Sequence, residues 1–293
     1  MRIWLNAARP RTLPAAIAPV LVGTAAACAA INELPRWGGF AAALIASVLI
    51  QIGTNLANDY SDARRGADSA DRLGPVRVTS AGLVTPRRVL VATWIAFGIA
   101  ALLGVYLAVL AGPIILLVGA LSIAAGVLYT GGPRPYGYAG LGEVFVFLFF
   151  GLVSVNGSYY VQLEELAWLP FGLSVAIGCL STAILVVNNT RDMDTDRRAE
   201  KVTLAVRIGR EWARALYLFL MIGAFVVLAL TIVFNGGPWP ALLGLLALPL
   251  TIKPIKSMRT RTDGPSLNAA LAETGAALGV FSLLTAIGLV ISA

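Results

Sequence analysis

The chain has 293 residues, of which 58% are hydrophobic and only 13% charged, and its mean hydropathy is +0.82. Soluble domains contain roughly 45–50% apolar and about 25% charged residues, so this composition excludes an ordinary soluble protein and predicts an integral membrane protein. The net charge of +7 comes from Lys and Arg residues that flank apolar runs, so it indicates membrane topology and not nucleic-acid binding.

Nine apolar runs follow one another along the chain. A bilayer requires about 20 apolar residues per spanning helix. Because the runs are continuously apolar and do not alternate, they predict helices, not a β-barrel. In chain order they cover 13–31, 38–59, 89–110, 113–130, 143–162, 168–189, 212–234, 238–252 and 267–292. We therefore expect an all-α, polytopic bundle of nine transmembrane helices that forms one domain over residues 1–293.

The positive residues orient this bundle. Short cytoplasmic loops are enriched in Lys and Arg. With a cytoplasmic N-terminus, the nine-helix count places every Lys and Arg except Arg36 on the cytoplasmic side, and one missed helix would reverse every later loop. The first run continues past signal-peptide length without a cleavage site, so no cleavable signal is expected. We expect a multi-pass protein of the cell (plasma) membrane.

Seven of the eight aspartates occur in two short segments that directly follow the second and sixth runs. Residues three or four apart share one face of a helix. Each segment therefore forms a polar stripe: Asn55, Asp59 and Asp62 in the first, and Asn188, Asp192 and Asp196 in the second. An even number of runs separates the two stripes, so both are expected on the cytoplasmic face, with active-site loops over about 60–88 and 190–211.

Carboxylates beside a membrane core are costly unless a cation neutralises them. Mg²⁺ prefers a few carboxylates together with water and phosphate oxygens, which predicts two incomplete cages that one diphosphate would close. The candidate ligands are Asp59, Asp62, Asp68, Asp192 and Asp196. Asp71 and Asp194 are left outside this set because Asp194 points off its stripe. The alternative is that these acids are solvated loop charges paired with nearby arginines.

Basic and aromatic residues near these segments are further candidates. Arg77 and Lys201 would contact diphosphate oxygens, although topology alone would also place cations there. The segment from Tyr129 to Glu143 combines Arg134 with tyrosines and five glycines, and would press Tyr and Arg side chains over a site between helices. An interfacial aromatic belt is the alternative. The chain has no histidine, which removes the commonest general base.

Aromatic rings are concentrated in the fifth run, at Phe145, Phe147, Phe149 and Phe150. Such rings would flank an isoprenoid chain or an allylic cation. The alternative, which the sequence favours for these rings, is helix packing or lipid contact.

The two aspartate segments resemble the Asp-rich motifs of the UbiA-type intramembrane prenyltransferases, and the resemblance covers nearly the whole chain. Residues 58–62 (NDYSD) resemble the first motif and residues 192–196 (DMDTD) the second. Residues 9–23, 132–151 and 201–209 resemble the branch that prenylates 1,4-dihydroxy-2-naphthoate in menaquinone synthesis. The Asp motifs are specific to the superfamily, whereas the GLGE sequence within 132–151 indicates the branch.

This resemblance implies a nine-helix bundle around a central cavity, with Mg²⁺ as cofactor and a polyprenyl diphosphate and 1,4-dihydroxy-2-naphthoate as substrates. Demethylmenaquinone, diphosphate and CO₂ would be the products. The five aspartates would bind metal, and Arg77, Lys201 and Arg134 would neutralise the diphosphate. Tyr129 would shield the allylic cation. The amides in or beside the stripes are further candidates for substrate binding: Asn55, Asn58 and Asn188.

Three other functions remain open from the sequence. Another branch of the superfamily would attach prenyl groups to 4-hydroxybenzoate, haem or a sugar phosphate. A CDP-alcohol phosphotransferase also has metal-binding aspartates near membrane helices, but its DGxxAR and GxxxDxxxD pattern is absent. A cation-coupled transporter would carry its acids near the bilayer midplane, whereas these lie at helix ends. Oligomeric state and isoprenoid length are not predicted.

Overall fold

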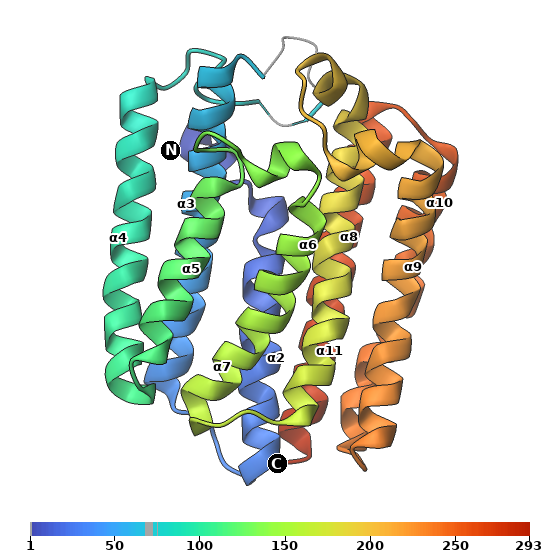
Figure 1. The fold of residues 1–293 in the computed structure, drawn as a ribbon. Helices are drawn as coiled ribbons and strands as arrows, with labels where there is room; N and C mark the ends of the chain where they lie inside the picture. The colour runs from blue at the N-terminus through green and yellow to red at the C-terminus, as the bar shows by residue number, and fades with distance from the viewer. Residues whose placement is uncertain (1, 68–72, 75) are drawn as a thin grey trace.

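The computed structural model describes residues 2–67, 73–74 and 76–293, and these residues form a bundle of helices (Figure 1). Asp68, which the sequence analysis predicts as a metal ligand, lies outside the described residues. The elements are α1 (Arg2–Ala8), η1 (Pro10–Thr12), α2 (Pro14–Ile31), α3 (Trp37–Arg65), α4 (Pro86–Ala111), α5 (Ile114–Leu128), η2 (Tyr136–Ala139), α6 (Gly142–Val146), η3 (Phe147–Val153), α7 (Ser154–Leu163), α8 (Trp168–Arg198), α9 (Leu204–Phe234), η4 (Trp239–Thr251), α10 (Ile252–Thr260) and α11 (Gly264–Ile291).

The long helices coincide with the apolar runs of the sequence. In the described part of the chain, eight helical segments are long and apolar enough to cross a membrane, and α5, with 15 residues, is a shorter apolar helix. The prediction of an all-α, polytopic membrane protein is thereby confirmed. Two of the eight segments are composite: α6, η3 and α7 form one rod, and η4 continues into α10.

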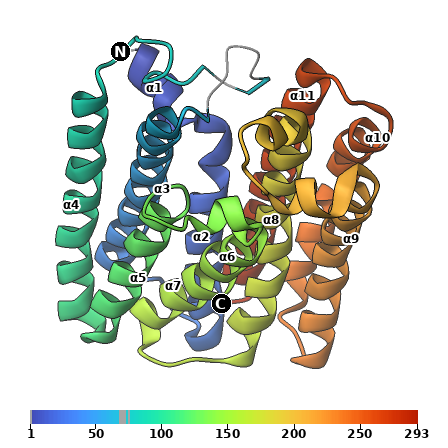
Figure 2. The ribbon, with the colours of Figure 1, turned by 45° about the horizontal axis from the view of Figure 1, so that its top comes forward.

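Both aspartate motifs lie on helices, not in loops. Helix α3 continues to Arg65 and α8 to Arg198, beyond the expected ends at 59 and 189. The helices persist because their motif side chains are buried against other elements and not released into water. Gly66, in the left-handed conformation (φ 68°), then ends α3, as glycine commonly does at a helix C-terminus. Figures 1 and 2 show α3 and α8 ending on the side of the bundle where the chain begins.

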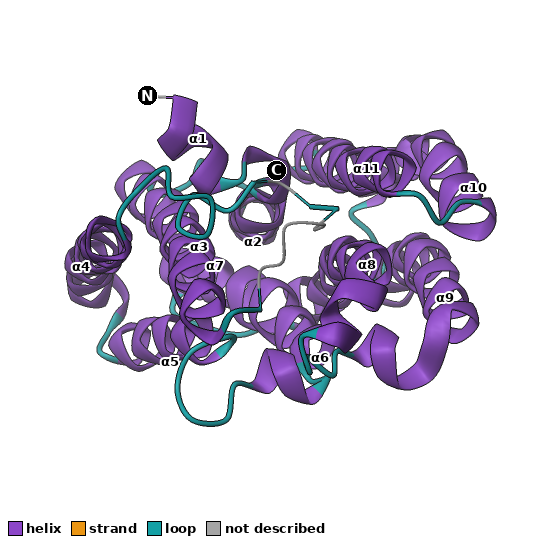
Figure 3. Ribbon diagram, turned by 90° about the horizontal axis from the view of Figure 1, so that it is seen from above, coloured by secondary structure: helices purple, strands orange, loops and turns teal. Residues whose placement is uncertain are grey.

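The core is packed unevenly between the two sides of the bundle. Seen from above, α3, α4 and α5 gather on one side and α8, α9, α10 and α11 on the other, with α2 between them (Figure 3). The main buried cluster joins α2, α8, α9 and α11 through residues such as Val22, Leu180, Leu228 and Leu278. In α8 78% of the apolar window is buried, compared with 28% in α4. The less densely packed side contains the cavity described below.

Helix α11 approaches η4 very closely at Gly288. A Cβ atom at Gly288 would overlap the backbone of Pro240 and Ala241, whereas a Cβ at Gly279, on the same helix, would meet nothing within 4 Å. Only a residue without a side chain therefore permits this contact.

We expect Gly288→Ala to destabilise the protein by about 1–3 kcal/mol, because the backbone of η4 must move to admit the methyl group. The matched control Gly279→Ala should be neutral or stabilising by up to about 1 kcal/mol, because alanine favours helix more than glycine does. Thermal unfolding of the two variants in detergent checks this. Equal unfolding midpoints would contradict the close contact.

Candidate active site

The first aspartate motif is enclosed by the chain that follows it. Asp59 accepts hydrogen bonds from the backbone N–H groups of Val78 (3.0 Å) and Thr79 (2.9 Å). Val78 is buried in a small cluster with Leu56 of α3 and Val89 of α4, which holds this segment against the helix. The carboxylate of Asp59 is therefore buried and already hydrogen-bonded.

Asp62, one turn further along α3, is only 1% exposed and uses both of its oxygens. Oδ2 pairs with Nη2 of Arg77 at 2.8 Å, and Oδ1 accepts a hydrogen bond from the hydroxyl of Tyr138 at 3.0 Å. A buried carboxylate is tolerated only with such partners. Arg77, which the sequence analysis expected to contact diphosphate oxygens, is thus paired with the first motif.

The second motif has its own arginine. Arg191 donates to both oxygens of Asp192, from Nε at 2.8 Å and from Nη2 at 2.6 Å. The same guanidinium donates to Asn188 and to Asn268 of α11, each at 2.8 Å. One turn later, Oδ1 of Asp196 lies 3.6 Å from Nζ of Lys201. Arg191 therefore fixes Asp192 and links α8 to α11.

Tyr138, in η2, joins the two motifs. Besides its hydrogen bond to Asp62, its ring centroid lies 5.5 Å from the guanidinium carbon of Arg65 and 5.5 Å from Nζ of Lys201. Lys201 is in turn the partner of Asp196. Tyr138 thus contacts Asp62 directly and is linked to Asp196 through Lys201, so the two motifs meet around one aromatic side chain.

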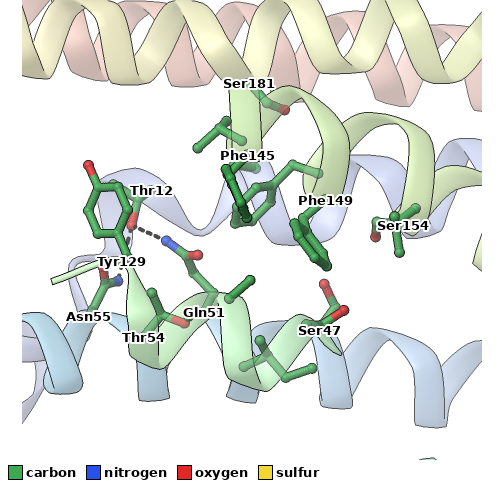
Figure 4. Close-up of a pocket in the computed structure, with 18 of the residues that line it drawn as sticks. Thr12, Ser47, Gln51, Thr54, Asn55, Tyr129, Phe145, Phe149, Ser154 and Ser181 are labelled. Atoms are coloured by element: carbon green, nitrogen blue, oxygen red, sulfur yellow. Dashed lines mark hydrogen bonds between the residues drawn. The ribbon is translucent and has the colours of Figure 1, made fainter. Parts of the chain in front are cut away.

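A cavity of about 290 Å³ begins at this junction and extends between the helices (Figure 4). Its polar end is lined by Asp62, Arg77 and Lys201, and its remaining walls are mostly apolar side chains of α2, α3, α4, α5, η3, α7 and α8. Tyr136 lies near the polar end, where its hydroxyl donates to the carbonyl of Ala125 at 2.8 Å. Burial raises the pKa of Tyr136, so this phenol stays protonated.

The structure gathers most of the predicted site residues. The predicted residues that line the cavity are Asn55, Asn58, Asp62, Arg77, Tyr129, Asn188 and Lys201. Asp59, Asp192 and Asp196 are buried but are not part of the cavity lining. Asn58 accepts a hydrogen bond from Thr130 at 2.8 Å, and so ties α3 to the loop that carries Tyr138.

Two predicted positions differ from the rest. Arg134 is exposed and is not part of the cavity lining, because the loop that carries it turns Tyr138 inward instead. Asp194, left outside the predicted set, has a side chain 66% exposed and pairs with Arg210. The sequence analysis expected tyrosines of this loop over the site but did not single out Tyr138, and it missed Arg191. Their positions, inside the Tyr-rich loop and directly before Asp192, were the available signals.

The carboxylates of the two motifs match Mg²⁺ in the kind and number of ligands that they offer. Each motif offers two buried carboxylates, and Mg²⁺ is typically held by one or two carboxylates with water and substrate phosphates. Within the described residues no group of three acidic, Cys or His side chains is close enough to hold a metal alone. A site of this kind would therefore be completed by the phosphate groups of a ligand.

Comparison with known proteins identifies the family. The model of the UbiA prenyltransferase family matches residues 16–272. This chain belongs to the UbiA prenyltransferase family. The resemblance inferred from the two aspartate motifs is thereby confirmed.

Sequence relatives align with this chain over nearly its full length. It is 45% identical over 283 residues to the 1,4-dihydroxy-2-naphthoate octaprenyltransferase of Mycobacterium tuberculosis, which covers 97% of this chain and 95% of that protein. The enzyme of the same name from Escherichia coli is 38% identical, with 99% and 95% covered. A UbiA homolog from Archaeoglobus fulgidus, solved with GPP and Mg²⁺, shares the fold with a TM-score of 0.70 at 15% identity, covering 98% and 99%.

We expect Arg191→Met to destabilise the protein by about 3–5 kcal/mol, because Asp192 would remain buried after its guanidinium is removed. The double variant Arg191→Met/Asp192→Asn should recover much of this loss. Arg210→Met is the matched control: its partner Asp194 is exposed, so the loss should stay within about 1 kcal/mol. Thermal unfolding in the presence of chelator measures all three. Equal losses for Arg191→Met and Arg210→Met would contradict the buried pair.

Proposed function

We infer that this chain transfers a polyprenyl group from polyprenyl diphosphate to 1,4-dihydroxy-2-naphthoate, releasing diphosphate and CO₂ and forming demethylmenaquinol, the hydroquinone form of demethylmenaquinone. The observation that carries this proposal is that Asp62 and Lys201, the partner of Asp196, both contact Tyr138 and both line the polar end of an apolar cavity. The 45% identity to a naphthoate octaprenyltransferase over nearly the whole chain supports the choice of acceptor.

The aspartates are proposed to hold the metal and, with it, the diphosphate. Asp59 and Asp62 would form one Mg²⁺ site and Asp192 and Asp196 the other, with Asp68 as a further proposed ligand. Mg²⁺ bound there would stabilise the charge that develops on the diphosphate as the C–O bond ionises.

Arg77 and Lys201 are proposed to bind diphosphate oxygens. Both line the cavity, and both are paired with motif aspartates. Because a carboxylate that ligates a metal is a weaker partner for a cation, these two side chains can exchange their aspartates for phosphate oxygens. Arg134, which is exposed, is not assigned this role.

The apolar walls are proposed to hold the prenyl chain and exclude water, so that the allylic cation reacts with the acceptor and not with solvent. The rings of Tyr129, Phe145 and Phe149 line the cavity and can stabilise the cation through their π faces. A carbon–carbon bond then forms at the ring carbon that bears the carboxylate. The carbon–carboxylate bond breaks, its electron pair returns to the ring, and CO₂ leaves. This sequence needs no proton abstraction from carbon, which suits a chain without histidine.

The proposal includes nine membrane crossings in one domain over residues 1–293, a cytoplasmic N-terminus and location in the cell membrane. Figure 1 supports an odd number of crossings, because the two chain termini lie at opposite ends of the bundle. Arg36, the exception to the charge rule, lies at the start of α3, at the end opposite to the aspartate motifs, where it pairs with Glu164 at 2.9 Å. The loops 60–88 and 190–211 would then face the cytoplasm with the active site.

We expect Asp59→Asn and Asp192→Asn each to lower prenyl transfer by about 100-fold or more, because each removes a metal ligand. Asp194→Asn, from the same segment but exposed, should retain activity. The assay uses purified protein, Mg²⁺ and labelled prenyl diphosphate, with dihydroxynaphthoate and 4-hydroxybenzoate as competing acceptors and chelator as a further control. Full activity in both Asn variants would remove the metal assignment. Preferred transfer to 4-hydroxybenzoate would overturn the acceptor.

Lys201→Met should slow ionisation by about 100-fold, because it removes a cation that stabilises the departing diphosphate. Single-turnover release of diphosphate measures this step directly, and the KM for the naphthoate should change little. An unchanged single-turnover rate would count against the role of Lys201.

A further inference from the structure

Gln51 is a polar residue of the cavity that the mechanism above does not use. It lies on α3 two helical turns before Asp59, within the apolar part of the span, and is 8% exposed. Its side chain lines the cavity (Figure 4). A primary amide in this position requires hydrogen-bond partners, because no water surrounds the span.

The hydrogen bonds of Thr12 fix the orientation of this amide. The hydroxyl of Thr12 donates its single proton to the carbonyl of Arg9 at 3.0 Å, so it can only accept from other groups. It accepts from Nε2 of Gln51 at 3.1 Å and from Nδ2 of Asn55 at 3.3 Å. The carbonyl oxygen of Gln51 is therefore turned away from Thr12.

That carbonyl oxygen receives no hydrogen bond from any residue that the structure describes. Oε1 of Gln51 is also not among the fully buried side-chain atoms that lack a partner, so it is accessible from the space around it. Because Gln51 lines the cavity, a donor within the cavity can reach this oxygen. This oxygen can therefore accept a hydrogen bond from an N–H or O–H group of a molecule in the cavity.

Aromatic rings line the same part of the cavity. Phe145 stacks on Tyr136 with ring centroids 3.9 Å apart, and Phe149 continues the series 6.1 Å further on, with both pairs inclined by only 18°. Figure 4 shows Phe145 and Phe149 across the cavity from the helix that carries Gln51. The space between them therefore has a flat apolar wall and one hydrogen-bond acceptor.

The chemistry of this subsite selects one of the two substrates. A prenyl chain has no hydrogen-bond donor, and a carbonyl oxygen repels a diphosphate. The naphthoate has a flat bicyclic ring and two hydroxyl groups, of which the 1-hydroxyl bonds internally to the neighbouring carboxylate. Its 4-hydroxyl is free to donate.

We propose that Oε1 of Gln51 accepts a hydrogen bond from the 4-hydroxyl of the naphthoate, with the ring lying against Phe145 and Phe149. This assignment rests on the proposed function and adds the residue that positions the acceptor. With the 4-hydroxyl held below the diphosphate-binding cations, the edge of the ring that bears the carboxylate faces Arg77 and Lys201, where the allylic carbon is released.

Equilibrium binding tests this assignment without turnover. The full chain in nanodiscs, with Mg²⁺ and inorganic pyrophosphate in place of the donor headgroup, is titrated with 1,4-dihydroxy-2-naphthoate and with 1-hydroxy-2-naphthoate, which lacks the 4-hydroxyl. The unmodified protein should bind the first about tenfold more tightly, the effect of one buried hydrogen bond. In Gln51→Met, which keeps the size of the side chain but removes the acceptor, this ratio should fall to about one.

Ser47→Ala is the matched control, one turn deeper on α3. Its hydroxyl lines the cavity but already donates to the carbonyl of Ala16 at 2.8 Å, so the tenfold ratio should persist. Retained pyrophosphate affinity reports that each variant is folded. The assignment is overturned if Gln51→Met keeps the tenfold ratio, or if the unmodified protein binds both naphthoates alike, as it would if the carbonyl bonded only water. Failure of the proposed function is distinguishable, because it would appear as no prenyl transfer to any naphthoate.

Discussion

The burial of carboxylates at one end of a membrane bundle is the constraint on which this structure depends. Transfer of a carboxylate out of water costs several kcal/mol unless a cation or hydrogen-bond donors replace the lost solvent. Each described motif aspartate has such a replacement: backbone amides for Asp59, Arg77 for Asp62, Arg191 for Asp192 and Lys201 for Asp196. The partners come from different parts of the chain, so satisfying these four charges also assembles the site.

The uneven packing of the bundle gives the site its second property, an apolar space beside the charges. Helix α8 is buried on nearly all sides and fixes the second motif rigidly against α9 and α11. Helices α3, α4 and α5 are joined by small clusters, one around Ala42, Leu107 and Ile115 and another that packs Leu56 of α3 against Val89 of α4. The first motif therefore lies at the edge of the cavity, and the second lies at the edge of the densely packed core. A long hydrocarbon substrate can be received on one side while the other side maintains the geometry.

Sequence reasoning predicted the parts of this arrangement that depend on local periodicity. Apolar runs located the long helices, although α3, α8, α9 and the segment of η4 and α10 extend six to nine residues beyond the expected bounds. The three- and four-residue spacing correctly placed Asp59 with Asp62 and Asp192 with Asp196. Sequence reasoning could not predict which side chains would pair with these aspartates. Arg191 was counted among topological charges because nothing local indicates that its side chain turns back onto Asp192. Arg134 was assigned to the site and Tyr138 was not, because the path of a loop with several glycines is set by tertiary contacts such as that of Thr130 with Asn58.

The position of Tyr138 has a consequence for the energetics of the whole site. Its ring and hydroxyl contact groups from α3 and from the segment after α8, so neither motif can rearrange without altering the surroundings of the other. Side chains that share a partner in this way are thermodynamically coupled, and the effects of changing them are not additive. If the two proposed metal sites are occupied, their occupancy would then be sensed jointly, as one cooperative unit.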